Sequence, residues 1–221
     1  MQSAGCYANF FCSATVRNLG VVFDSHLTMS SHITDLCKSL TYHLRNISSI
    51  RRYLDKDSCH HIIRSLILTR LDYANAMLLG TNSKNIARLQ KLQNWAAKII
   101  LCAKKRDHAT PLIKQLHWLN VRNRIMYKIM VTVYKCLNGH SPSYLSSTIS
   151  LYVPKRTGLR SASDITRLTE HRFLPRNLAS AANAMFEFAA PHQWNSLPAT
   201  LRTSGSLHTF KKGLKTYLFP H

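Results

Sequence analysis

The amino-acid sequence predicts a mainly α-helical protein, and three observations carry this prediction. Apolar residues recur at intervals of three and four over most of residues 30–140, which is the spacing of helices with one buried face. The hydrophobic content of 45% is ordinary for a globular core. Only 7 Gly and 7 Pro occur in 221 residues, which is not typical of a disordered or fibrous chain.

One β-strand is expected before the helices. The segment Val16–Asp24 is rich in β-branched and aromatic residues, and Leu19, Val21 and Phe23 alternate along it. No partner strand is evident after it, so we expect an orphan strand whose sheet partners lay upstream. The residues before Thr15 show no periodicity, and we expect a disordered lead-in there.

Two helices are expected next. Ser30 or Ser31 is a suitable N-cap for the first helix. Asp55 is a suitable N-cap for the second, which is expected to continue to just before Gly80. Their apolar faces are formed by Ile33, Leu36, Cys37, Leu40, Leu44 and Ile47, and by Cys59, Ile62, Ile63, Leu66, Ile67, Ala74 and Leu78.

A third helix is predicted over Lys84–Cys102 and a fourth over Val121–Asn138, which ends at Gly139. Between them, Pro111–Leu119 is expected to form one or two helical turns. Proline is suited to the first position of a helix because its missing N–H is not needed there, so Pro111 is expected to begin this segment.

The helical rhythm is lost after Ser141. Short pieces are separated by Pro142, Pro154, Gly158, Pro175, Pro191 and Pro198. The segment Leu159–Trp194 is expected to mix short strands with loops. A final amphipathic helix carries Leu207, Phe210, Leu214 and Leu218 on one face. The chain is therefore expected to divide into a lead-in (1–15), a helical domain with one strand (16–140) and an irregular α+β C-terminal region (155–221).

The charge of the chain is its most unusual property. It contains 30 Lys and Arg against 9 Asp and Glu, which gives a net charge of +21 and a pI near 10.2. Between Tyr73 and Ser163 the only acidic residue is Asp107. Ordinary surfaces mix both signs of charge, so this distribution favours a polyanionic partner such as nucleic acid.

The third helix carries the strongest local signal. Its apolar residues fall on one side, whereas basic residues and Trp95 fall on the other. Cations can neutralise phosphates while an indole stacks on a sugar or an unpaired base. The alternative is a solvated basic face whose Trp95 packs on a neighbouring domain. Further basic residues follow this helix, and the candidate nucleic-acid-binding residues are Lys84, Arg88, Lys91, Trp95, Lys98, Lys104, Lys105, Arg106, Arg122, Arg124 and Lys128.

No catalytic residue, metal ligand or cofactor site is predicted. The acidic residues are dispersed, without the carboxylate cluster that a two-metal enzyme needs, and neither a nucleophile elbow nor a Gly-rich phosphate loop occurs. The six cysteines form no C-x-x-C pair. Cys37, Cys59 and Cys136 fall on apolar helix faces, so we expect buried thiols in a reducing compartment rather than ligands. No apolar run approaches the ~18 residues of a membrane span.

Short blocks along the chain resemble, in the same order, the C-terminal part of LINE-type non-LTR retrotransposon reverse transcriptases of the jockey-like and related branches. The resemblance covers about Val16 to Phe219. Its blocks are Val16–Asp24, Leu27–Met29, Ser31–Ile33, His43–Ile47, Thr69–Tyr73, Arg88–Asn94, Leu116–Leu119, Ser143–Leu145, Ala189–Pro198 and Phe210–Phe219.

The resemblance implies a helical thumb and post-thumb region that holds a template–primer duplex by its backbone. In that family the polymerase aspartates and the endonuclease lie upstream of the Leu19-Gly20-Val21 strand. We therefore expect a truncated remnant of an RNA-directed DNA polymerase, intracellular if expressed, that binds RNA or DNA without enzyme activity. No membrane partner and no small-molecule substrate are expected. The alternatives are a piece of a longer active polymerase and a retained RNA- or DNA-binding protein.

Overall fold

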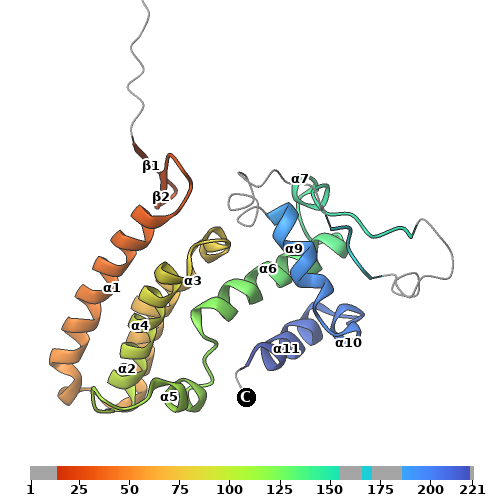
Figure 1. The fold of residues 1–221 in the computed structure, drawn as a ribbon. Coiled ribbons are helices and arrows are strands. Elements are labelled where there is room, and N and C mark those ends of the chain that lie inside the picture. Colours follow the sequence, from red (N-terminus) through yellow and green to blue (C-terminus); the bar gives the residue numbers. More distant parts are fainter. Residues whose placement is uncertain (1–13, 155–165, 171–185, 220–221) are drawn as a thin grey trace, which may run out of the picture.

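The computed structural model describes residues 14–154, 166–170 and 186–219, and it is mainly helical, as predicted (Figure 1). Two strands, β1 (Thr15–Asn18) and β2 (Val21–Asp24), precede the helices. The α-helices are α1 (Ser30–Ile50), α2 (Lys56–Ile63), α3 (Thr69–Asp72), α4 (Ser83–Ile100), α5 (Ala109–Gln115), α6 (Val121–Leu137), α7 (Ser143–Ser146), α9 (Phe186–Asn195), α10 (Ala199–Arg202) and α11 (Leu207–Leu218). Shorter helical turns are η1 (Arg51–Tyr53), η2 (Arg64–Leu68) and η3 (Asn75–Leu78).

The predicted orphan strand is wrong, because Val16–Asp24 folds back on itself as a hairpin. Strands β1 and β2 are antiparallel, with Asn18 opposite Val21. The two residues between them have left-handed φ angles, +46° at Leu19 and +82° at Gly20. A two-residue turn of this hand matches the natural twist of a hairpin. Strand β1 begins at Thr15, and residues 1–13 of the expected lead-in lie outside the described part of the chain.

The hairpin is attached to α1 through a histidine. The Val22 backbone N–H donates to Nδ1 of His32 over 3.4 Å, which requires a neutral ring. The pKa of His32 lies below its ordinary value of 6.5, chiefly because burial penalises the charged form; Asp35 acts in the opposite direction and Arg17 in the same one. Folding therefore opposes protonation of this ring.

Acidification from about pH 7.5 to about pH 5 is expected to destabilise the protein. Just below pH 6.5 the unfolded chain binds more protons at His32 than the folded chain. The free energy of unfolding therefore decreases as the pH is lowered through this window. Burial also lowers the pKa of His43, which adds to the same trend. Chemical denaturation at several pH values measures the effect. His32→Gln should make the free energy of unfolding less dependent on pH than in the unaltered chain; an unchanged dependence would contradict the assignment to His32.

Helices α1 and α4 run side by side in the same direction. Near their beginnings, Nδ2 of Asn85 donates to the Ser30 hydroxyl over 3.1 Å. At their ends, the Arg51 guanidinium donates to the carbonyls of Ile99 and Ile100 over 2.7 and 3.1 Å. The predicted serine cap of α1 is wrong: Met29, with φ +59°, occupies the N-cap position without a side-chain hydrogen bond. Buried residues on α1 are Ile33, Leu40, Leu44 and Ile47.

The predicted second helix is interrupted. Asp55 is its N-cap, as predicted, and accepts from the backbone N–H groups of Asp57 and Ser58. The helical path passes through α2, a π-helical turn at η2 and α3, and it ends at Asp72 rather than near Gly80. Apolar spacing resumes in η3, which explains why the sequence suggested a continuous helix. The break places the Asp72 carboxylate at the helix end, where a partner from α6 reaches it.

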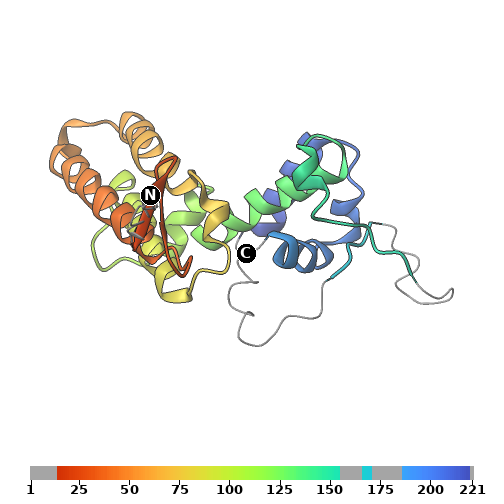
Figure 2. The ribbon, with the colours of Figure 1, turned by 90° about the horizontal axis from the view of Figure 1, so that it is seen from above.

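Helix α6 joins two groups of helices (Figure 2). It packs against α3, η3 and α4, and also against α7, α9 and α11. This position explains why it buries residues on more than one side: Val121, Ile125, Ile129, Met130, Val131, Val133, Tyr134 and Cys136. The third and fourth helices were predicted within two residues. The expected final helix is present as α11, and Phe210 and Leu214 of its predicted apolar face are buried. The division at residues 140–155 stays a prediction.

Helix α9 was not predicted, because Pro191 suggested a break. Pro191 lies inside the helix, and its side chain is buried. The neighbouring Trp194 is fully buried, donates from Nε1 to the Thr166 carbonyl over 2.9 Å, and packs on Phe210 of α11. In place of the short strands predicted for this region, the described residues contain one isolated β-bridge, between Leu151 and Leu168. The short α5 begins two residues before Pro111, so Pro111 is not its first residue.

Candidate nucleic-acid interface

The basic row on α4 follows from a seven-residue repeat. Lys84, Lys91 and Lys98 differ by seven positions, so they drift by only about 20° per step and lie about 10 Å apart along the helix. Lys84 and Lys91 are exposed, and Lys98 is half-buried. Buried residues on the opposite side of α4 include Leu89, Ala96, Ala97 and Ile100. The three lysines therefore lie on one face of α4, in a row nearly parallel to the helix axis.

Arg88 and Trp95 form a second row beside the first, and it is half-buried against α1. The Arg88 guanidinium donates to the Thr34 hydroxyl over 3.2 Å and to Oδ1 of Asn85 over 3.3 Å. These bonds hold Arg88 against a neighbouring helix. We therefore assign Arg88 to helix packing and exclude it from the candidate interface.

Trp95 lies in a cleft of about 720 Å³ where basic residues from two segments meet. Lys91 and Lys98 of α4 line this cleft together with Lys105 from the loop that follows. The Lys98 ammonium donates to the Lys105 carbonyl over 2.7 Å, which folds the loop back towards the helix. Ser48 of α1 lines the same cleft. Four of the predicted residues are thus brought together.

Residues between α1 and α2 extend this surface, and the sequence analysis missed them. Arg51 binds the carbonyls at the end of α4, so η1 is held beside the cleft. Arg52 lies over the ring of Tyr53, with its guanidinium carbon 4.6 Å from the ring centroid, and both residues are exposed. Lys56 and Lys104 line a neighbouring cleft. The run Arg51-Arg52-Tyr53 was visible in the sequence as a basic pair next to an aromatic residue.

Two acidic residues close to this surface serve local backbone contacts. Asp107 accepts from the Lys104 backbone N–H over 2.7 Å, and Asp55 caps α2. Within the described ranges, no cation of this region forms an ion pair with a carboxylate. We call this surface the basic end: Arg52, Lys56, Lys91, Trp95, Lys98, Lys104, Lys105 and Arg106.

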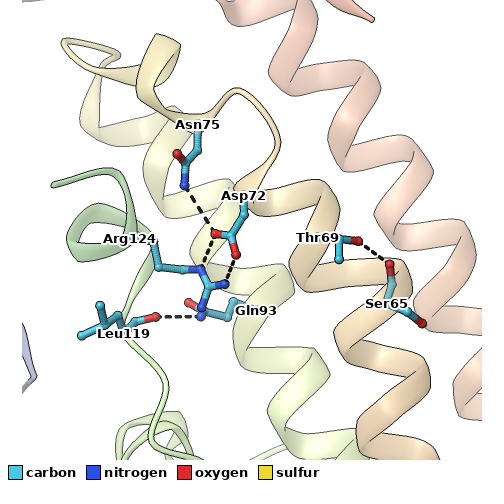
Figure 3. A network of polar contacts seen from close by, with 7 residues as sticks. All are labelled: Ser65, Thr69, Asp72, Asn75, Gln93, Leu119 and Arg124. Carbon is cyan, nitrogen blue, oxygen red and sulfur yellow. Dashed lines mark hydrogen bonds and ion pairs between the residues drawn. The ribbon is translucent and has the colours of Figure 1, made fainter. Parts of the chain in front are cut away.

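The remaining predicted residues lie elsewhere. Arg124 points into the protein, where its guanidinium makes a two-bonded ion pair with Asp72, and only 16% of its side chain is exposed (Figure 3). We therefore exclude Arg124 from the candidate interface. Arg122 lines a separate cleft of about 800 Å³ between α4, α5, α6 and α9, and Lys128 lines a third cleft. Lys84 is at the opposite end of α4 from the basic end.

The expected cysteine burial is confirmed for Cys59 and Cys136, and Cys37 is half-buried. Burial raises the pKa of the Cys59 thiol, so it is a poor nucleophile. In the described part of the chain, no three His, Cys, Asp or Glu side chains gather as a metal site. None of the described helices has the length and apolarity needed to cross a membrane.

Comparisons with protein-family models, with curated proteins and with solved structures find no match to this chain.

Proposed function

We propose that the chain binds nucleic acid through the basic end, by contacts to the phosphate backbone. The observation that supports this most is the convergence of Lys91, Lys98 and Lys105 around Trp95 in one cleft. Cations that face the same hollow repel one another. A bound polyanion relieves this repulsion, and the release of counterions from its backbone favours it over small ions. Backbone contacts carry no base information, so binding is non-specific in sequence.

We further propose that this region descends from the thumb and post-thumb part of a LINE-type reverse transcriptase. The support for descent is the ordered series of sequence blocks. The hairpin removes one argument for a lost palm, because β1 and β2 satisfy each other. The descent therefore rests on sequence resemblance alone, whereas the binding proposal rests on the basic end.

As a remnant, the chain has no polymerase activity of its own in this proposal. A primer-extension assay with Mg²⁺ or Mn²⁺ tests this directly, and metal-dependent synthesis would overturn it. A reading frame upstream with an Ala-Asp-Asp turn would favour the second candidate, a piece of a longer active polymerase. Retention as an RNA- or DNA-binding protein is the third candidate, and it makes the same prediction for binding.

Duplexes of unrelated sequence are expected to bind with similar affinity and with strong dependence on salt. Each neutralised phosphate contributes about −0.9 to the slope of log K against log salt on B-DNA, so four to five contacts predict a slope of roughly −4. Fluorescence anisotropy with labelled DNA duplex, RNA duplex and RNA–DNA hybrid measures both quantities. Absence of binding at about 50 mM salt, or binding that ignores salt, would overturn the proposal.

A further inference from the structure

A second basic cleft, of about 670 Å³, lies between η2, α6, α11 and the loop at residues 116–119. It shares no lining residue with the cleft around Trp95. Its volume is within the range of about 300–1,000 Å³ that is usual for small-molecule sites. No sign of it is visible in the sequence, because its walls come from three parts of the chain that are far apart: residues 60–75, residues 116–128 and Lys215.

Three cations from three different elements line this cleft. They are Arg64 of η2, Lys128 of α6 and Lys215 of α11, and all three are exposed. Among the residues that the structure describes, none of the three is in an ion pair. His60 and His117 add ring nitrogens to the same lining. The cleft therefore offers positive charge from several directions to one bound group.

Among the described residues of the lining, Asp72 is the only carboxylate, and it is already neutralised. Asp72 accepts two hydrogen bonds from Arg124, as Figure 3 shows, so it does not cancel the charge of the three other cations. Beside this pair lies Asn75, which is 3% exposed and donates from Nδ2 to Asp72 over 3.4 Å. Its Oδ1 is buried without a hydrogen-bond partner. A buried acceptor of this kind costs free energy unless a donor reaches it.

The wall of the cleft is aromatic and held in place. Trp118 is 6% exposed, and its ring centroid lies 6.1 Å from that of His60. The chain turns before it at His117, with φ +52°, and the Trp118 backbone N–H donates to the Ile113 carbonyl over 3.1 Å. This wall of the cleft is thus formed by a packed residue, and it is preformed for a ligand.

We propose that this cleft binds a phosphate monoester of a small hydroxylated molecule, of the class of a nucleoside monophosphate. Arg64, Lys128 and Lys215 hold the phosphate, whose oxygens accept from their N–H groups. A hydroxyl of the organic part donates to Oδ1 of Asn75 and satisfies it. Such a group reaches the cleft either as a free nucleotide or as the terminal phosphate of a nucleic-acid strand.

Isothermal titration with adenosine monophosphate tests this. We expect saturable binding, at least about tenfold weaker binding of adenosine, and a similar loss in Lys128→Gln/Lys215→Gln, because a charge-assisted bond is worth about that factor. The matched control Lys38→Gln/Lys212→Gln removes the same charge and should bind normally. Equal binding of adenosine, no saturable binding, or equal losses in the two double variants would overturn the proposal.

Two further measurements test the hydroxyl contact and identify the source of the phosphate. Asn75→Ala should weaken the binding of adenosine monophosphate and leave the binding of inorganic phosphate unchanged. An equal effect on the binding of both ligands would overturn the role of Asn75. A 5′-phosphorylated oligonucleotide that competes better than its 5′-hydroxyl form, while free nucleotide binds weakly, identifies a strand end as the source. Because Lys91, Lys98 and Lys105 lie outside this cleft, their removal should leave nucleotide binding intact, so failure of this proposal is distinct from failure of duplex binding.

Discussion

The triple variant Lys91→Ala/Lys98→Ala/Lys105→Ala is expected to bind duplexes roughly 30- to 100-fold more weakly than the unaltered chain at low salt. The three side chains line the cleft around Trp95, and no carboxylate among the described residues neutralises them. Loss of three phosphate contacts should also reduce the steepness of the log–log salt dependence by about 2.7. Fluorescence anisotropy over a salt series measures both effects in one experiment.

The control for this variant must remove the same charge elsewhere. Lys38→Ala/Lys211→Ala/Lys212→Ala also lowers the net charge by three, but its residues lie on α1 and α11, away from the basic end. The ion pair of Lys38 with Asp35 is exposed, so its loss costs little stability. If both triple variants lose affinity equally, binding follows the net charge of +21 and the basic end is not the site.

The contribution of Trp95 is separable from that of the lysines. An indole adds stacking on unpaired bases, worth about 1–3 kcal/mol per base, but adds little on an intact duplex, whose bases are already stacked. Trp95→Leu should therefore weaken single-stranded probes more than duplexes. A purely packing role for Trp95, which was the alternative reading of the sequence, would instead lower stability and leave the relative affinities unchanged.

The basic row was predictable because it belongs to one helix. Spacing along the chain determines which residues of a helix share a face, so Lys84, Lys91 and Lys98 could be grouped from the sequence. The neighbour that covers each face of a helix was not predictable, in α4 or in α6. Arg88 meets Thr34, and Arg124 meets Asp72, at separations of 54 and 52 residues. Two of the eleven candidate side chains, Arg88 and Arg124, are thus bonded to partners that local sequence patterns do not reveal.

The same distinction explains which elements were predicted correctly. Helices α4 and α6 combine regular apolar spacing with asparagine N-caps, Asn82 and Asn120, so local signals agree. The hairpin was missed because Leu19, a poor residue for left-handed φ, occupies the turn and continues the apparent alternation of the strand. Helix α9 was missed because its proline is tolerated through burial between other helices, which only the tertiary structure provides.

Phe210→Ala is expected to lower the free energy of unfolding by about 3–5 kcal/mol, the usual cost of removing a fully buried aromatic ring. Phe210 is 0% exposed. Its ring stacks on Tyr134 of α6 at 4.6 Å between centroids and packs on Trp194 of α9 at 5.7 Å. Truncation leaves a cavity among three helices, whereas Phe210→Leu refills most of it and should cost clearly less. Chemical denaturation measures both variants.

The form of this transition also tests the division into domains 16–140 and 155–221. Helix α6 packs against α3 and α4 and also against α9 and α11. A rigid helix shared by two groups couples their unfolding, so circular dichroism and tryptophan fluorescence should report a single shifted transition in Phe210→Ala. Separate transitions for the two signals would show independent units. Tyr134 of α6 contacts Phe210 and Ser204, so removal of the residues after 140 would uncover it. A single transition would therefore mean that the basic end should be studied in the whole chain.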